Sequence, residues 1–162
     1  DVIHIGPLQS VRFGMFIRAN DPKLSGKPPD YLWQQELGYV RGTLAVETLI
    51  KSKNIANVEV AERASIDKML LAGRFNVLID SERLFLTHLM QTQNTDNITL
   101  AATVLEEPTY LLLHNKAKAH APAIKQAVQR WLETGRWKRE YQSINKLNGL
   151  PPDMSLVRYP PR

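Results

Sequence analysis

The chain has 162 residues, which is long enough to bury a core as one domain or as two small lobes. Its hydrophobic content of 43% and charged content of 23% are those of an ordinary soluble protein, and no apolar run approaches the roughly 20 residues of a membrane-spanning helix. Acidic residues are interspersed among the basic ones, so the net charge of +5 favours mild surface basicity over a dedicated nucleic-acid or membrane site. The absence of cysteine excludes disulfides and thiolate metal sites.

The first half of the chain predicts strands that alternate with helices. An apolar, partly alternating run predicts a strand at 11–17, and the turn-rich segment 21–36 predicts a surface loop. A second strand is expected at 37–40, a helix follows at 44–50, and a short strand is expected at 58–60. This alternation is typical of an α/β unit with a largely parallel sheet.

The middle of the chain continues the same order. Ser65 is a capping residue for a helix that Gly73 ends, and the apolar run 75–79 predicts a buried strand. A helix is expected at 82–91. Two further strands, 98–105 and 109–113, are expected on either side of an acidic turn that contains a proline.

The last third of the chain predicts two amphipathic helices and an extended tail from 149 to 162. Pro122 suits the first turn of the first helix, and Gly135 separates it from the second. The aromatic residues Trp131 and Trp137 lie in a basic segment, which is one pattern of nucleic-acid binding. Because both fall on the apolar stripes of their helices, core packing is the favoured interpretation, and we predict no nucleic-acid partner.

The turn Arg41-Gly42-Thr43 joins a predicted strand to a predicted helix. The first amide groups of a helix have no partner within the helix and carry a partial positive charge, so such a turn can hold an anion. The glycine-rich motifs of phosphate loops and dinucleotide sites are absent from the sequence. Two interpretations therefore stay open: Thr43 caps the helix, or it offers its hydroxyl to a ligand.

Asp80 follows the strand 75–79 at its carboxyl end, where open α/β sheets bind their ligands. A carboxylate at that position can accept hydrogen bonds from an ammonium group. It can equally cap the helix that begins at residue 82, because aspartate is a favoured capping residue. The residues alone leave both roles open.

The sequence contains no catalytic or metal-binding constellation, so we predict no enzymatic activity, no metal and no cofactor. The four histidines are too scattered to have metal-ligand spacing: His4, His88, His114 and His120. No G-x-S-x-G nucleophile motif is present. Glu106 and Glu107 are adjacent, and neighbouring residues of an extended chain point to opposite faces, which disfavours an acid–base pair.

The order of four segments resembles that of one known family. The segments are ELGYVRGTLAVETL, SIDKMLLAGRFNVLID, LEEPTYLLLHNKA and AIKQAVQRWLETGRW, and they extend over about residues 10–147. In this order and spacing the chain resembles the family 3 extracellular solute-binding proteins, which have the type 2 periplasmic-binding fold. No single segment is diagnostic of that family.

The resemblance implies an α/β protein made of a second lobe and the C-terminal part of a first lobe. The implied divisions are the end of lobe one with a first crossing strand at 1–19, the second lobe at 20–97, return strands at 98–113, C-terminal helices at 114–147 and a tail at 148–162. Arg41, Gly42 and Thr43 would then hold the ligand carboxylate. Asp80 would hold the ligand ammonium.

The function implied by the resemblance is the capture of a small polar solute, such as an amino acid, by lobe closure. The expected partner is the inner-membrane permease of an ABC-type transporter, in the periplasm and after removal of a signal peptide. The alternative is a ligand-sensing domain of a regulatory protein with the same fold. Far fewer residues precede the first crossing strand than in the family, so we expect a fragment of a longer protein. The apolar stripes that contain Trp131 and Trp137 would then be open to self-association.

Overall fold

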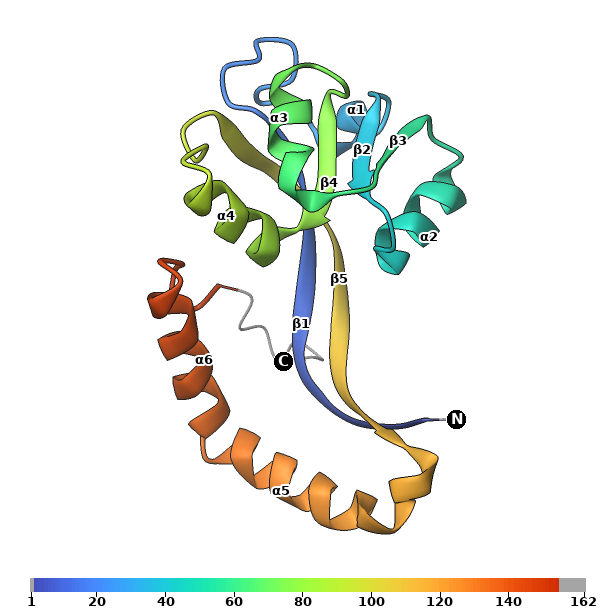
Figure 1. Ribbon diagram of the computed structural model, residues 1–162, viewed down its shortest axis with the longest axis vertical. Helices are drawn as coiled ribbons and strands as arrows, with labels where there is room; N and C mark the ends of the chain where they lie inside the picture. Colours follow the sequence, from blue (N-terminus) through green and yellow to red (C-terminus); the bar gives the residue numbers. More distant parts are fainter. Residues whose placement is uncertain (1, 155–162) are drawn as a thin grey trace. The chain divides into compact units, whose positions relative to one another are not determined.

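The computed structural model describes residues 2–154 (Figure 1). The chain divides into two compact units, one formed by residues 12–105 and the other by residues 1–11 together with 106–162. The long strands β1 (Val2–Arg18) and β5 (Ile98–His114) contribute residues to both units. No helix within residues 2–154 is both long enough and apolar enough to cross a membrane.

The sheet has five strands in the order β3-β2-β4-β1-β5. Strand β2 (Leu37–Val40) pairs in parallel with β3 (Asn57–Val60) and with β4 (Val77–Ser81), and β4 pairs antiparallel with β1. The predicted α/β class is confirmed, and the three parallel strands β2 to β4 form one continuous part of the sheet. The buried sequences of β2 and β4 are typical of strands that are covered on both faces, whereas β3, at the end of the strand order, has two exposed residues.

Five helical segments belong to the unit 12–105, and Figure 1 shows them around the parallel strands. They are α1 (Pro29–Leu32), α2 (Leu44–Lys53), the 3-10 turn η1 (Arg63–Ser65), α3 (Ile66–Leu71) and α4 (Glu82–Gln91). The predictions of β2, of the start of α2 and of both ends of α4 are confirmed. The segment 21–36, predicted as a surface loop or a short linker, contains the single turn α1, which begins with a proline at its first position.

The core of this unit lies between the sheet and the helices α3 and α4. Phe16, Phe75, Leu78 and Phe85 are fully buried within it. Phe16 and Phe85 meet edge to face with 4.7 Å between ring centres, which is a favoured aromatic geometry. This packing fixes β1, β4 and α4 around the position of Asp80.

Strand β5 is continuous over 17 residues, although two strands separated by a turn were predicted. That prediction was wrong because Pro108 was taken as a break. β5 is the last strand in the sheet order, and an edge strand has one side without ladder hydrogen bonds, so a residue without an N–H is tolerated there.

The other unit contains η2 (Asn115–His120), α5 (Ala121–Glu133) and α6 (Arg136–Leu147). Gly135 lies between the two helices with φ of +67°, a conformation that suits glycine, and the predicted break is confirmed. Trp131 and Trp137 meet edge to face with 4.7 Å between ring centres. Among the described residues, α5 has no fully buried side chain, and Leu147 of α6 is 86% exposed. Residues 155–162 of the predicted tail lie outside the described residues.

Candidate functional site

The carboxyl ends of the three parallel strands meet at one edge of the sheet. Tyr39 of β2 is paired with Ile79 of β4, so the turn after Val40 lies level with Asp80. Arg63 follows the carboxyl end of β3. The predicted residues Arg41, Gly42, Thr43 and Asp80 therefore occupy one edge, and ligands of open α/β sheets bind at such edges.

The turn after β2 is closed by a side chain of its own helix. The N–H of Gly42 donates to a carboxylate oxygen of Glu47 at 2.8 Å, and Glu47 lies in the first turn of α2. Gly42 has φ of +82°, in the region that favours glycine. The hydroxyl of Thr43 makes no capping hydrogen bond. Glu47, which the sequence analysis did not consider, thus satisfies one of the amides that an external anion would use.

Arg41 is the most accessible charged side chain of the turn, with 65% of the side chain exposed. Its Nε binds a carboxylate oxygen of Glu59, and the other oxygen of Glu59 accepts a hydrogen bond from Tyr39 at 3.0 Å. These two hydrogen bonds, with Arg41 as the larger cause, lower the pKa of Glu59. Burial, together with the neighbouring Glu59, raises the pKa of the Tyr39 hydroxyl. Arg41 is therefore held over the carboxyl end of the sheet while most of its surface remains open.

Asp80 is buried at the same edge, with 1% of its side chain exposed. One oxygen accepts the N–H of Ser81 at 2.7 Å, and the other binds Nη1 of Arg63. Burial raises the pKa of Asp80 above its ordinary value, and the hydrogen bond and charge of Arg63 only partly oppose this effect. The group predicted to meet a ligand ammonium already has a cationic partner within the chain.

A second buried carboxylate near Asp80 also has its partners within the chain. Glu82 begins α4 and is buried, and it accepts a hydrogen bond from the hydroxyl of Thr103. The Nε of Arg12 lies 3.6 Å from its other oxygen. Gly14 is paired with Asp80 across β1 and β4, and a Cβ there would lie 2.3 Å from Leu100. Close packing therefore bounds the site on the β1 side.

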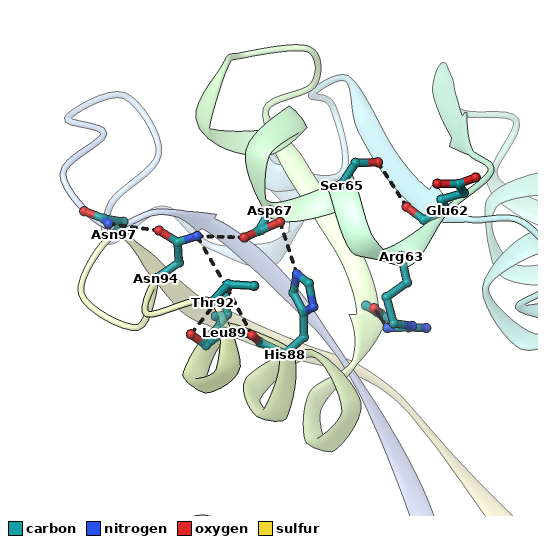
Figure 2. Close-up of polar contacts among 10 residues, drawn as sticks. Glu62, Arg63, Ser65, Asp67, His88, Leu89, Thr92, Asn94 and Asn97 are labelled. Carbon is teal, nitrogen blue, oxygen red and sulfur yellow. Dashed lines mark hydrogen bonds and ion pairs between the residues drawn. The ribbon is translucent and has the colours of Figure 1, made fainter.

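A separate polar cluster joins α3 to α4 (Figure 2). Asp67 is fully buried, and it lies between Nε2 of His88 at 3.1 Å and the side-chain amide of Asn94 at 2.7 Å. Burial raises the pKa of Asp67, but the neighbouring His88 imidazole and the hydrogen bond from Asn94 outweigh that effect, so the pKa lies below the ordinary value. His88 was predicted to have an isolated or partly buried polar role, and the structure places it in this cluster, where it supports the core.

The sequence analysis missed three of the charged residues at the edge: Glu47, Glu59 and Arg63. A usable signal was the pair Glu62-Arg63 shortly after β3, because residues in that position reach the carboxyl edge. Within residues 2–154 no group of three or more histidine, aspartate or glutamate side chains could hold a metal ion. The edge therefore offers arginine side chains and backbone amides as donors.

Comparison of the sequence with protein-family models and with curated proteins finds no match. Solved structures do match the fold. An amino acid ABC transporter substrate-binding protein from Streptococcus pneumoniae, bound to L-arginine, matches over 91% of this chain and 62% of its own, with a TM-score of 0.70 and 15% identity. The GluR0 ligand-binding core from Nostoc punctiforme, in complex with L-glutamate, matches over 86% of this chain and 63% of its own, with a TM-score of 0.67 and 18% identity.

A histidine kinase sensor domain with similarity to periplasmic binding proteins matches equally well, over 85% of this chain and 60% of its own, with a TM-score of 0.69 and 14% identity. The chain thus has the periplasmic-binding-protein-like fold that the resemblance implied. It spans about three-fifths of the length of these structures. At such identities the likeness establishes the fold, whereas function has to be argued from the site.

Proposed function

We propose that this chain is a binding module, or part of one, that captures a small polar solute at the carboxyl edge of β2, β3 and β4. The observation that carries the proposal is that the Arg41–Thr43 turn, Arg63 and Asp80 meet at that edge. The side chain of Arg41 is 65% exposed and that of Arg63 is 32% exposed. Arginine presents five N–H donors in a planar fork that fits carboxylates, so two arginines here favour a solute with an anionic group.

The acidic groups at this edge are engaged in pairs, which favours binding over catalysis. Glu59 is bound to Arg41, and Asp80 is bound to Arg63. A general base has to be free to accept a proton from a substrate. Two matching structures that contain a ligand, a ligand-binding core with L-glutamate and a substrate-binding protein with L-arginine, are in line with this proposal.

The biological setting that we propose is solute uptake. The protein would deliver its solute, such as an amino acid or a related acid, to an inner-membrane ABC-type permease from the periplasm. The substrate-binding protein of an amino acid transporter among the structural matches supports this role. Purified protein should bind to vesicles that contain the cognate permease only when solute is present, and equal binding without solute would contradict the role.

A sensor function is the second candidate, and the match to a histidine kinase sensor domain favours it. The two candidates differ in what accompanies the chain. A kinase or other output domain encoded in the same reading frame would support sensing. A permease gene next to the coding sequence, with no output domain in the frame, would support uptake.

Isothermal titration calorimetry with a panel of amino acids and small carboxylic acids tests solute binding. We expect one chemical class in the panel to bind, and we expect Arg41→Gln to weaken it by about tenfold, the value of one lost charge-assisted hydrogen bond. Thr43→Ala tests whether the hydroxyl of Thr43, which makes no capping hydrogen bond, contacts the solute. If no solute in the panel binds to the unmodified protein, the proposed function is wrong.

We further propose that copies of the chain associate through the apolar surface of α5, α6 and β5. Leu112 is 58% exposed and Leu147 is 86% exposed, and such large apolar side chains at a surface favour association. Sedimentation velocity should detect dimers whose population falls in Leu147→Glu. A monomer at all concentrations would exclude this association.

A further inference from the structure

Both oxygens of the Asp80 carboxylate already accept hydrogen bonds within the chain, and burial hides the rest of the group from an incoming cation. Its two oxygens accept from the N–H of Ser81 and from Arg63, and 1% of the side chain is exposed. A ligand ammonium could reach Asp80 only by displacing Arg63. That exchange would break an ion pair within the chain. The new ion pair with the ligand would have to offset the same cost of burying the Asp80 carboxylate.

Arg63 reaches Asp80 across the middle of the carboxyl edge. It belongs to η1, which follows β3, whereas Asp80 lies on β4, and β2 lies between these two strands. Its guanidinium therefore ends beside the turn at the end of β2 (Figure 2 shows the side chain extending from η1). Within the described residues, its one hydrogen bond is the contact from Nη1 to Asp80, and the side chain is 32% exposed. Its other N–H groups make no hydrogen bond within the described residues, and the exposed part of the guanidinium can donate to a ligand.

Two other carboxylates of the edge are engaged as well, whereas Glu62 is exposed and points away from the guanidinium of Arg63 in Figure 2. Glu59 binds Arg41 and Tyr39, and Glu47 accepts the N–H of Gly42. A cationic group that entered between the two arginines would meet carboxylates that are already engaged, namely Glu47, Glu59 and Asp80. An anionic group would find the open donors of two arginines. The edge therefore offers open hydrogen-bond donors, whereas an ammonium group needs acceptors.

We propose that this site takes small carboxylic acids that lack an α-ammonium group, and that Arg63, held in place by Asp80, determines this choice. The inference rests on the proposed function, since it names the solute class of the same site. In this arrangement the solute carboxylate lies against the guanidinium of Arg63, a geometry in which two parallel hydrogen bonds form. Asp80 acts as the positioning residue for Arg63 and makes no contact with the solute.

Matched pairs of acids that differ only in the α-ammonium group give the test. Glutarate is compared with L-glutamate, and succinate with L-aspartate, by calorimetry at pH 7 on the full chain. We expect the acid without ammonium to bind at least about tenfold more tightly in the pair that fits the site. We expect Arg63→Gln to weaken that binding by about tenfold or more, and Arg63→Lys, which keeps the charge but loses the planar fork, to weaken it less.

Arg74→Gln is the matched control. Arg74 is exposed and precedes β4, so it lies at the opposite end of that strand from Asp80, and the same substitution there should leave binding unchanged. Asp80→Asn should weaken binding of the acid, because it releases Arg63. Thermal unfolding of each variant verifies that it is folded before its affinity is interpreted.

Two results would separate a failure of this inference from a failure of the proposed function. In the first, the amino acid binds as well as or better than its matched acid, or Arg63→Gln strengthens binding of the amino acid. Either observation means that Arg63 occupies the ammonium position and that a ligand cation displaces it. The inference is then wrong, while solute binding stands. If neither member of either pair binds, and the wider amino-acid panel also fails, the proposed function itself is wrong.

Discussion

Removing Arg63 should destabilise the fold in a way that depends on pH, because its partner Asp80 is a buried carboxylate. A hydrogen bond to a charged group contributes about 1.5–3 kcal/mol, and breaking a fully buried pair costs more. Because 32% of the Arg63 side chain is exposed, water can partly replace it, and the N–H of Ser81 still serves one oxygen of Asp80. We therefore expect Arg63→Gln to cost about 2 kcal/mol at pH 7.

The sign of the pH dependence follows from the direction of the pKa shift. Burial already raises the pKa of Asp80 above 3.8, and loss of Arg63 removes the main opposing contribution, so the pKa rises further in the variant. A raised carboxyl pKa means that the folded state is favoured by protonation. The cost of Arg63→Gln should therefore be greatest above the folded pKa of Asp80 and should shrink as the pH falls towards 3.8.

Urea unfolding at pH 7 and at pH 4.5, followed by tryptophan fluorescence, measures this cost. The control is the same substitution in an Asp80→Asn background, where residue 80 no longer titrates and where the influence of the nearby His88 on Asp80 is also absent. There we expect the cost of Arg63→Gln to fall below about 0.5 kcal/mol and to be the same at both pH values. Equal costs in both backgrounds, or a cost that grows as the pH falls, would refute the assigned pairing.

Three further perturbations test the local geometry. Glu47→Ala removes the acceptor of the Gly42 N–H and should lower the free energy of unfolding by about 0.5–1 kcal/mol. It should also strengthen anion binding at the freed amide, and weaker anion binding would contradict this. Gly38→Ala places a Cβ 2.6 Å from the buried ring of Phe75 and should lower the free energy of unfolding by about 1–3 kcal/mol. Adding Phe75→Leu should remove much of this cost, and additive costs would contradict the contact. The lowered pKa of Asp67 contributes stability above pH 3.8 that is lost as the pH falls below this value. In a plot of unfolding free energy against pH, Asp67→Asn should therefore reduce the slope on the acid side, and an unchanged slope would contradict this.

The elements that the sequence predicted correctly are those whose signals are local. β2 and α4 have apolar runs or stripes bounded by capping and turn residues, and their bounds agree with the structure. Pro108 shows where local signals fail. Its effect depends on whether its strand lies at the edge or in the middle of the sheet, and the order of strands is a property of the whole fold.

Unit boundaries are another property that local signals do not define. The structure changes from one unit to the other between residues 11 and 12 and between residues 105 and 106. Both positions lie inside continuous strands, where no loop, glycine or proline-rich linker marks a boundary. The division at 1–19, 20–97 and 98–113 follows from the resemblance, concerns the lobes of a longer protein, and stays a prediction.

Positions in the site could be predicted, but the partners of those positions could not. The unpaired amides at a helix start pointed to Arg41, Gly42 and Thr43 as candidates, and the carboxyl-end rule for parallel strands pointed to Asp80. The role of Asp80 depends on a residue 17 positions away in the sequence that reaches it across an intervening strand. An aspartate with this sequence context can bind a ligand ammonium or anchor an arginine, and only the strand order β3-β2-β4 brings Arg63 within reach. The charge that such a site presents to solvent therefore depends on the topology of the sheet, and substitution of Arg63 alone removes one of its two cationic groups.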